Sequence, residues 1–336
     1  MSPLRPFAGL AVALLAVAAQ AQPGRPIFVL NSQDATISVV DPVRFTETKR
    51  IPTGKEPHHL YLTPDEKSLV VANAASDSLT FIDPATAEVQ RTVTGIADPY
   101  HLRFSPDMKW FVTASNRLDR LDIYRWNGLV GAGASAPVAQ PLTLVARLPA
   151  PKTPSHLSID NRSRTLYASL QDSDELLAVD LATQKPRWKI AVGKMPADLY
   201  LAPDDRTLLV AMTGDDVVEA YDVSVEPPKL LKRIKTGAGA HAFRSRGDGR
   251  HVFVSNRVAN TVSQIDLQTL EAVDRYPVPG GPDCMDLTAD GKMLFATSRW
   301  ARRLSVIDLE KKQVVQSVPV GRSPHGVWTL DHAPRR

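Results

Sequence analysis

Six of the eight histidines in this 336-residue chain recur at one position of a repeated pattern, one or two residues after a proline or glycine. They are His58, His59, His101, His156, His241 and His325. Asp198 and Cys284 occupy the same position in two further repeats. Imidazole nitrogen, carboxylate oxygen and thiolate sulfur are ligands of copper, zinc and iron. The pattern therefore predicts a transition-metal site built from several repeats.

A second set of polar residues falls in the turns that follow the second strand of each repeat. It comprises Asn73, Arg117, Asn256, Arg257, Arg299 and Trp300. Guanidinium groups bind carboxylate or phosphate through two parallel hydrogen bonds, and an indole offers a stacking face. These turns predict a small anionic ligand at the same place as the histidines. Arg103 and Arg244, further along the first strands, would extend the positive lining.

The repeat explains how residues so far apart in the sequence would meet. Its units start near Ile51, Val93, Leu148, Ile190, Ile234, Tyr276 and Val318, at intervals of 42, 55, 42, 44, 42 and 42 residues. Periods of about 40 to 45 residues are typical of propeller blades. Each unit alternates β-branched strands with Pro-Asp or Asp-Gly turns. Because the first strand of every blade lines the propeller axis, equivalent positions converge at one mouth of the channel.

The fold class predicted from these units is all-β: one seven-bladed propeller of four-stranded blades, spanning residues 22–336. The last unit, from Val318, retains only a first strand, whereas residues 26–50 contain three strands without a first one. We expect these N-terminal strands to complete the C-terminal blade. Such an arrangement closes the ring and leaves no free sheet edge between its ends.

The units resemble the YVTN-type repeat of the YncE-like family of bacterial periplasmic proteins. The resemblance covers Pro26 to Leu330 and rests on recurring Val-Gly-x-x-Pro, Pro-Asp, Val-Ser-Asn or Val-Ala-Asn, and Ile-Asp segments, as at Val192 to Pro196, Pro64-Asp65, Val254 to Asn256 and Ile82-Asp83. It implies the propeller fold, but members of the family bind or catalyse different things. The axial histidines are similar to those of seven-bladed propellers that hold copper or a modified haem, which adds a haem-type cofactor to the expected ligands.

The N-terminus predicts export. An apolar stretch from Phe7 to Ala18 precedes Ala19-Gln20-Ala21, so residues 1–21 are typical of a signal peptide and the mature chain is expected in the periplasm. The apolar stretch is too short to span a bilayer, and we expect no membrane span in the mature chain. Cys284 is the single cysteine, which excludes an intramolecular disulfide, and a net charge of +4 without a basic run gives no indication of nucleic-acid binding. We expect a monomer.

The second unit carries an insertion at residues 126–141 that is rich in glycine and other small residues. Such an insertion is typical of a surface loop. A role in docking a protein partner is the alternative interpretation of this loop.

Three functions follow from these patterns. The first is a non-catalytic binding protein whose axial site holds a metal or metallo-cofactor. The second is a lactonase-like hydrolase acting on a small anionic ester or lactone, with Asp198, Asp283 or a histidine moving the proton. The third is a protein-interaction scaffold that uses the opposite face of the propeller or the loop at Trp126; the histidines, copied by repeat duplication, are then merely solvated. The chain has no phosphate loop, nucleophile elbow or cysteine pair, which disfavours conventional cofactor enzymes.

Overall fold

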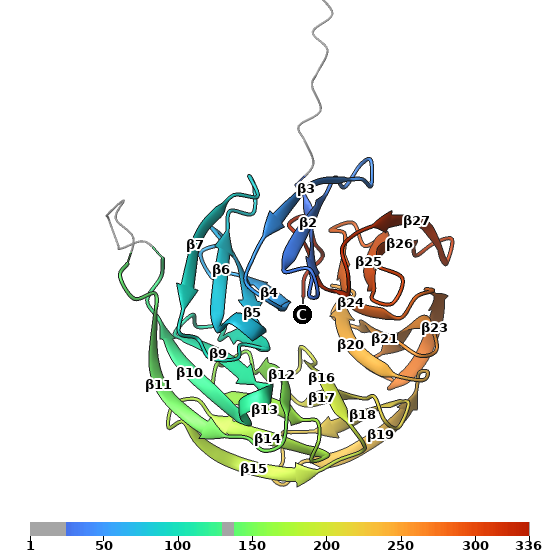
Figure 1. Ribbon diagram of the computed structural model, residues 1–336. Coiled ribbons are helices and arrows are strands. Elements are labelled where there is room, and N and C mark those ends of the chain that lie inside the picture. Colours follow the sequence, from blue (N-terminus) through green and yellow to red (C-terminus); the bar gives the residue numbers. More distant parts are fainter. Residues whose placement is uncertain (1–24, 130–137, 336) are drawn as a thin grey trace, which may run out of the picture.

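Residues 25–129 and 138–335 are described in the computed structural model, and they form seven four-stranded antiparallel sheets. The sheets stand around one axis as the blades of a propeller, with their first strands innermost (Figure 1). The prediction of an all-β, seven-bladed propeller is therefore confirmed. The predicted signal peptide, residues 1–21, lies outside the described residues.

The bounds of the strands are given from the axis outward. The first three blades are β4 (Pro57–Leu62), β5 (Leu69–Asn73), β6 (Ser78–Ile82) and β7 (Val89–Thr94); β8 (His101–Phe104), β9 (Trp110–Ser115), β10 (Arg120–Trp126) and β11 (Leu142–Pro149); and β12 (Pro154–Ile159), β13 (Thr165–Leu170), β14 (Glu175–Asp180) and β15 (Lys185–Ala191). The next two are β16 (Pro196–Leu201), β17 (Thr207–Met212), β18 (Val217–Asp222) and β19 (Lys229–Lys235); and β20 (Ala240–Ser245), β21 (His251–Asn256), β22 (Thr261–Asp266) and β23 (Glu271–Pro277). The last two are β24 (Pro282–Leu287), β25 (Met293–Ser298), β26 (Arg303–Asp308) and β27 (Gln313–Pro319); and β28 (Pro324–Thr329), β1 (Ile27–Asn31), β2 (Thr36–Val40) and β3 (Glu47–Pro52).

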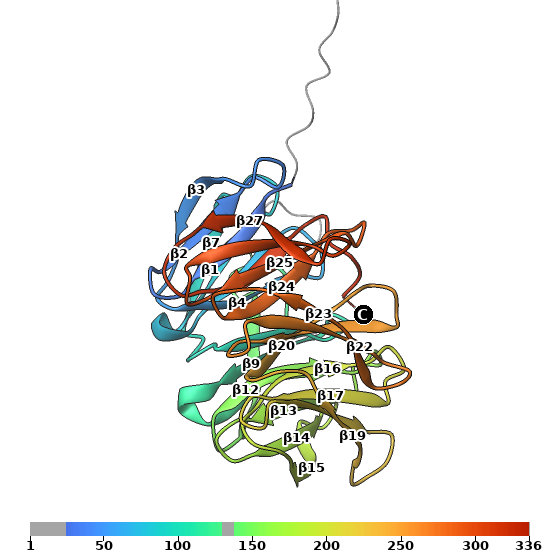
Figure 2. The same ribbon diagram turned by 90° about the vertical axis from the view of Figure 1, so that its right-hand side faces the viewer.

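The seventh blade contains both ends of the chain. Strand β28 pairs antiparallel with β1, and the order of this sheet is β28-β1-β2-β3. The N-terminal and C-terminal segments lie side by side in both views of the ribbon (Figures 1 and 2). This arrangement is consistent with the expected ring closure. The repeat starts at residues 51, 93, 148, 190, 234, 276 and 318 each lie in the outermost strand of the preceding blade.

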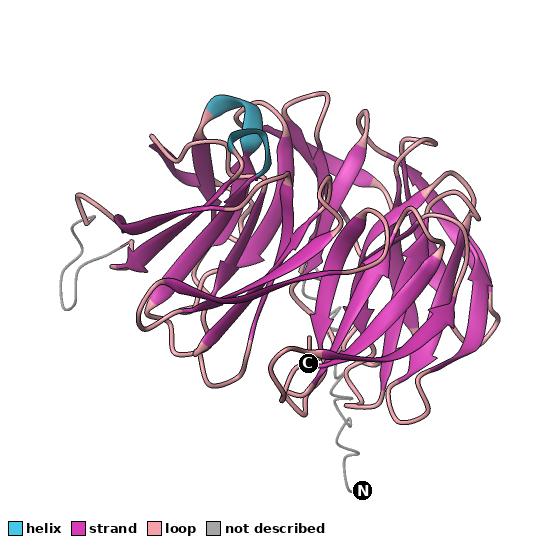
Figure 3. Cartoon of the chain, turned by 90° about the horizontal axis from the view of Figure 1, so that it is seen from below, coloured by secondary structure: helices cyan, strands magenta, loops and turns pink. Residues whose placement is uncertain are grey.

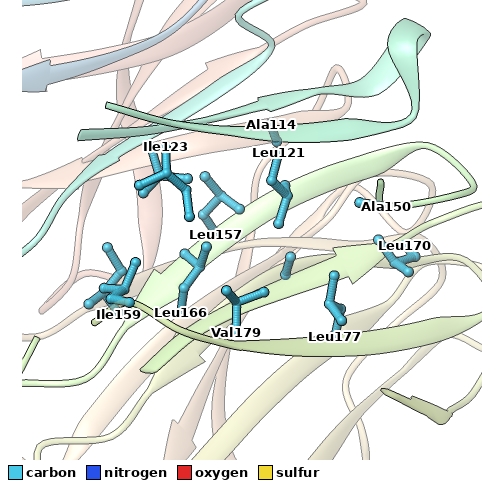
Figure 4. Close-up of a cluster of buried hydrophobic side chains, with 13 residues drawn as sticks. Ala114, Leu121, Ile123, Ala150, Leu157, Ile159, Leu166, Leu170, Leu177 and Val179 are labelled. Carbon is cyan, nitrogen blue, oxygen red and sulfur yellow. The ribbon is translucent and has the colours of Figure 1, made fainter. Parts of the chain in front are cut away.

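The core lies between neighbouring blades. Second and third strands such as β5 and β6 are buried at every residue, whereas the outermost strand β7 alternates between partly buried and exposed residues. Figure 4 shows one such layer, where Leu121 and Ile123 of β10 face Leu157, Leu166 and Val179 of the next blade. Strands with a neighbour on both faces need continuous apolar runs, which explains their valine-rich and leucine-rich sequences.

Two short 3-10 helices, η1 (Ala74–Ser76) and η2 (Asn116–Leu118), are the helices in the described ranges. They lie at one end of the axis, and the C-terminus lies at the other (Figure 3). Among the same residues, no helix is long and apolar enough to cross a membrane.

A β-bulge interrupts the inner strand of most blades where the histidines occur. In β4, Pro57 pairs with Asn73 and Leu60 with Val71, so that His58 and His59 together oppose the single residue Ala72. Equivalent register shifts occur in β12, β16, β20, β24 and β28. A bulge takes two successive residues out of the regular alternation and re-aims their side chains. Both residues of each pair can therefore approach the axis, including His58 and His325, which simple alternation would point away.

Hydroxyl side chains stabilise several of these bulges. Ser169 is fully buried opposite the bulge of β12; its Oγ accepts a hydrogen bond from His156 N at 3.0 Å and donates one to Ala197 O at 2.6 Å. Thr297 donates to His325 O at 2.7 Å in the same way. Because the two bonds of Ser169 reach two blades, its hydroxyl links the positions of neighbouring axial residues.

We expect Ser169→Ala to lower the free energy of unfolding by about 1–3 kcal/mol, because His156 N–H and Ala197 C=O would lose a partner in a buried place. Denaturant unfolding followed by circular dichroism measures the change. Ser317→Ala, at an exposed position of β27, is the matched control and should change stability by less than about 0.5 kcal/mol. Equal stability of the two variants would contradict the role given to this hydroxyl.

Candidate functional site

The six repeated histidines meet on the propeller axis. The ring centroid of His59 lies 4.5 Å from that of His101 and 4.9 Å from that of His156, and the last two rings are 4.9 Å apart. These three residues, from the first three blades, are called the histidine triad below. One ligand atom from each of them falls within 4.8 Å of the others.

A second group lies beside the triad. The rings of His58 and His325 are 3.6 Å apart, and Tyr100 covers His58 at 4.1 Å. His58, His59 and His325 form a further group of converging ligand atoms, as do His241, Asp283 and His325. His59 and His325 each belong to two groups, so the three groups are continuous. The predicted convergence of the six histidines is thus present in the structure.

Several imidazole nitrogens have no hydrogen-bond partner in the described part of the chain. They are His58 Nδ1, His59 Nε2, His101 Nδ1, His156 Nε2, both ring nitrogens of His241, and His325 Nε2. For two of these residues the other nitrogen is held. His156 Nδ1 lies 2.8 Å from Ser155 Oγ, and His325 Nδ1 donates to His58 O at 2.8 Å. Such contacts orient an imidazole and leave its second nitrogen available as a ligand.

Burial keeps these rings uncharged. His58, His101, His156, His241 and His325 are at most 3% exposed, and His59 is partly buried. Desolvation lowers the pKa of His58, His59, His101, His241 and His325 well below 6.5, and neighbouring imidazoles and arginines lower it further. The pKa of His156 is also lowered, although Asp198 opposes the effect. At neutral pH the axis therefore presents neutral imidazoles, the form that binds metals.

Asp283 is the carboxylate within this cluster. It is completely buried, and Oδ2 accepts hydrogen bonds from Arg257 at 2.5 Å and Arg299 at 3.3 Å. Burial alone would raise the pKa of Asp283, but the positive charges of Arg257 and Arg299 lower it to about 2. Two of the three predicted ligand-binding arginines thus neutralise an internal anion.

The other predicted residues have separate environments. Arg117 pairs with Asp98 and Glu56 and is half exposed, while Trp300 is 58% exposed and covers Gly281. Asn73 and Asn256 are buried inside their blades, where their amides donate to hydroxyls of the adjacent strand. The structure therefore does not bring these four residues into the histidine cluster.

Asp198 and Cys284 lie at the edge of the site. Both line a cavity beside the triad, but neither belongs to a converging group in the described residues. The carboxylate of Asp198 accepts hydrogen bonds from Leu199 N and Phe243 N, each at 2.8 Å. Burial raises the pKa of the Cys284 thiol well above its usual value, so the sulfur is protonated and a weak ligand.

Two cavities of about 80 Å³ each continue from the triad along the axis. We call them the upper and lower chambers. His59, His101 and His156 line the upper chamber, Arg244 and Tyr200 line the lower one, and both are lined by Tyr61, Arg103, Asp198, Phe243 and Arg335. The chambers form one polar passage between the histidines and the C-terminal end of the chain.

The C-terminal segment borders this passage. Arg335 pairs with buried Asp286 at 2.7 Å and stacks on Trp328, its guanidinium carbon 3.5 Å from the ring centroid. Arg244 also pairs with Asp286, at 2.8 Å, and donates to Ala333 O at 2.7 Å. Tyr100, Asp286 and Arg335 were not predicted as site residues from the sequence, and Asp283 was predicted only as a candidate for proton transfer. Asp283 and Tyr100 do occupy the repeated position, whereas nothing periodic marks Arg335.

The buried histidines predict acid-sensitive folding of the metal-free protein. Each imidazole titrates near 6.5 in the unfolded chain and lower in the folded one, so the unfolded state binds more protons in that interval. The free energy of unfolding should therefore fall as pH drops below about 7, by at most about 1.4 kcal/mol per pH unit for each histidine. Guanidinium unfolding between pH 7.5 and 5.5, with a chelator present, measures this slope.

His241→Phe should reduce that slope, because one buried imidazole is removed. Ser317→Ala should not, because it removes no titratable group. Ordinary carboxylates titrate near pH 4 and contribute little in this window. Identical slopes in the wild type and His241→Phe would show that this axial histidine is not held neutral by burial.

Comparison with solved structures places the propeller among many relatives of low identity. A functionally unknown protein from Desulfotomaculum acetoxidans DSM 771 superposes with a TM-score of 0.75 at 17% identity, over 91% of this chain and 99% of that one. The dihydro-heme d1 dehydrogenase NirN, in complex with DHE, superposes with a TM-score of 0.67 at 19% identity, over 94% of this chain and 77% of that one. A protein from Bacteroides uniformis ATCC 8492 that is proposed to be a 6-phosphogluconolactonase superposes with a TM-score of 0.69 at 16% identity, over 92% of this chain and 100% of that one. These likenesses show the fold alone.

No curated protein matches the chain in sequence. Residues 4–335 match the family described as YNCE-like beta-propeller, which agrees with the seven blades and the repeat on which they are built. Because that match spans nearly the whole sequence, this protein belongs to the YNCE-like beta-propeller family.

Proposed function

We propose that this propeller is a non-catalytic binding protein that holds one transition-metal ion at the histidine triad. The observation that carries the proposal is the convergence of three imidazoles, each with a buried nitrogen that has no hydrogen-bond partner in the described ranges. A buried polar atom without a partner costs about 1–3 kcal/mol, and a bound ion removes that cost. The signal-peptide pattern of residues 1–21 supports a periplasmic location.

The geometry and chemistry of the triad suit such an ion. Two ligand atoms bound to one ion at about 2.1 Å lie at most about 4.2 Å apart, so atoms now within 4.8 Å need only small ring rotations. Neutral imidazole is a preferred ligand of copper, zinc and iron. Because His59, His101 and His156 come from three different blades, the fold presents the triad without the help of a flexible loop.

The triad is the best supported of the three groups. In the group of His241, Asp283 and His325, the carboxylate already pairs with two arginines, whose positive charges would repel a cation. In the group of His58, His59 and His325, the rings of His58 and His325 stack against each other at 3.6 Å. The rings of the triad lie further apart, at 4.5–4.9 Å between centroids, and all three of its histidines line the upper chamber.

The alternative functions have less support. A haem-type cofactor does not fit the chambers, because cavities of about 80 Å³ are far below the roughly 300–1,000 Å³ of sites for larger ligands. A hydrolase would need a general base, but Asp283 is bound by two arginines with a pKa of about 2, and Asp198 accepts two backbone hydrogen bonds. Burial lowers the pKa of the axial histidines well below 6.5, which makes them weak bases. The scaffold hypothesis relies on the propeller face opposite the histidines or on the loop at 126–141, of which residues 130–137 lie outside the described structure.

Titration of chelator-treated protein with Cu²⁺ or Zn²⁺ at pH 7.5, followed by isothermal calorimetry and elemental analysis, tests the proposal. We expect about one ion per chain and a loss of affinity of about a hundredfold or more in His101→Ala. Loss of a single outer partner of a ligand already costs about 10–100-fold, and loss of a ligand should cost at least as much.

Two control variants locate the ion. His251→Ala should bind like the wild type, because His251 contacts Asp248 in the turn between β20 and β21 and is not a member of the triad. His241→Ala should also retain the ion, because His241 is not a member of the triad. If His241→Ala lost metal binding and His101→Ala retained it, the ion would lie in another group. A wild type that binds neither Cu²⁺ nor Zn²⁺ would refute the proposal.

A further inference from the structure

Arg103 is a cation in the passage without a carboxylate partner among the described residues. Its Nε donates to Leu157 O at 3.0 Å, and its guanidinium carbon lies 5.0 Å from the centroid of the Tyr61 ring. In contrast, Arg244, Arg257, Arg299 and Arg335 all pair with buried Asp283 or Asp286. Arg103 lines both chambers and follows His101 by two residues on the same inner strand.

The charges around the chambers leave an excess of positive charge. Arg103, Arg244 and Arg335 face two carboxylates, Asp198 and Asp286, while the histidines are neutral. A metal ion at the triad would add further positive charge to the same space. Such an excess attracts an anion, because charges inside a protein cavity are screened less than charges in bulk water.

The size of the upper chamber restricts that anion. The volume of about 80 Å³ is several times the roughly 10–15 Å³ that a single water molecule needs and well below the roughly 300–1,000 Å³ of sites for larger ligands, so the chamber suits a ligand of a few heavy atoms. Asp198 limits its charge, since a carboxylate on the wall disfavours a multiply charged anion. The chamber therefore suits a small monovalent anion such as azide, formate or nitrite.

We propose that the upper chamber binds a small monovalent anion between the histidine triad and the guanidinium of Arg103, with one end of the anion on the metal ion and the other on Arg103. This inference rests on the proposed metal site. Three protein ligands and a face open to a cavity leave one coordination position for an exchangeable ligand. The anion site thus lies inside the channel, and not among the arginines of the outer turns.

Azide titration of the Cu²⁺-loaded protein tests the inference, because azide bound to Cu²⁺ produces a charge-transfer absorption band. We expect saturable binding to the wild type and about ten- to a hundredfold weaker binding to Arg103→Met, since hydrogen bonds to charged groups are the stronger ones. Arg103→Lys keeps the positive charge but lacks the planar guanidinium, so its affinity for azide should lie between those of the wild type and Arg103→Met. Arg162→Met, at an exposed turn, should match the wild type.

The metal and anion readouts are separate. Copper stoichiometry should be the same in the wild type and Arg103→Met, because Arg103 is not a ligand, and circular dichroism checks that each variant is folded. Copper bound with equal azide affinity in both proteins would overturn the anion site and leave the metal site standing. A wild type that binds no copper would overturn both proposals, and equal azide binding to the metal-free protein would show that the anion does not need the metal.

Competition against azide identifies the class of anion. Displacement of azide by formate and acetate but not by nitrite would indicate a carboxylate ligand. Displacement by nitrite but not by formate or acetate would indicate an inorganic oxyanion. Phosphate should compete poorly, because it is larger and carries more charge. Strong displacement by phosphate would contradict the limits of size and charge set by the chamber and Asp198.

Discussion

The exclusion of water from the imidazoles on the axis is the constraint on which the site depends. Seven inner strands converge there, and five of them (β4, β8, β12, β20 and β28) bring buried or partly buried imidazoles to the axis. Burial makes a positive charge on any one ring costly, and each neighbouring ring adds to that cost. The cluster is therefore compatible with folding only while its histidines are neutral, which is also the state in which they can act as ligands.

Local backbone structure makes this crowding feasible. A regular inner strand would send one of two neighbouring residues away from the axis, and only a ring of single side chains could form. The bulges let both His58 and His59 approach it, and the buried hydroxyls of Ser169 and Thr297 satisfy backbone groups that bulges expose. The cluster of imidazoles is thus a product of irregular pairing repeated around the ring.

The sequence predicted the fold well because a propeller is encoded by short-range patterns that repeat. Strand alternation, Pro-Asp turns and the period near 42 residues are all local, and the convergence of His59, His101 and His156 follows from the symmetry that they imply. The pairing of charges was not predictable in this way. Arg257 and Arg299 lie in the expected turns, but both turn toward Asp283 of the sixth blade, a contact that depends on how neighbouring blades pack. Arg335 belongs to no repeat, so its contact with Asp286 could not be predicted from the repeat pattern.

These charge pairs explain why one arginine in the passage differs from the rest. Neutral histidines supply no negative charge to offset a divalent cation, and Asp283 and Asp286 are already paired with two arginines each. Asp198 alone cannot balance both a dication and Arg103 across the upper chamber. Without a further anion, metal and guanidinium would repel each other through a weakly screened space. An anion between them turns that repulsion into two attractions, so occupation of the triad by a metal should itself favour the uptake of an anion beside Arg103.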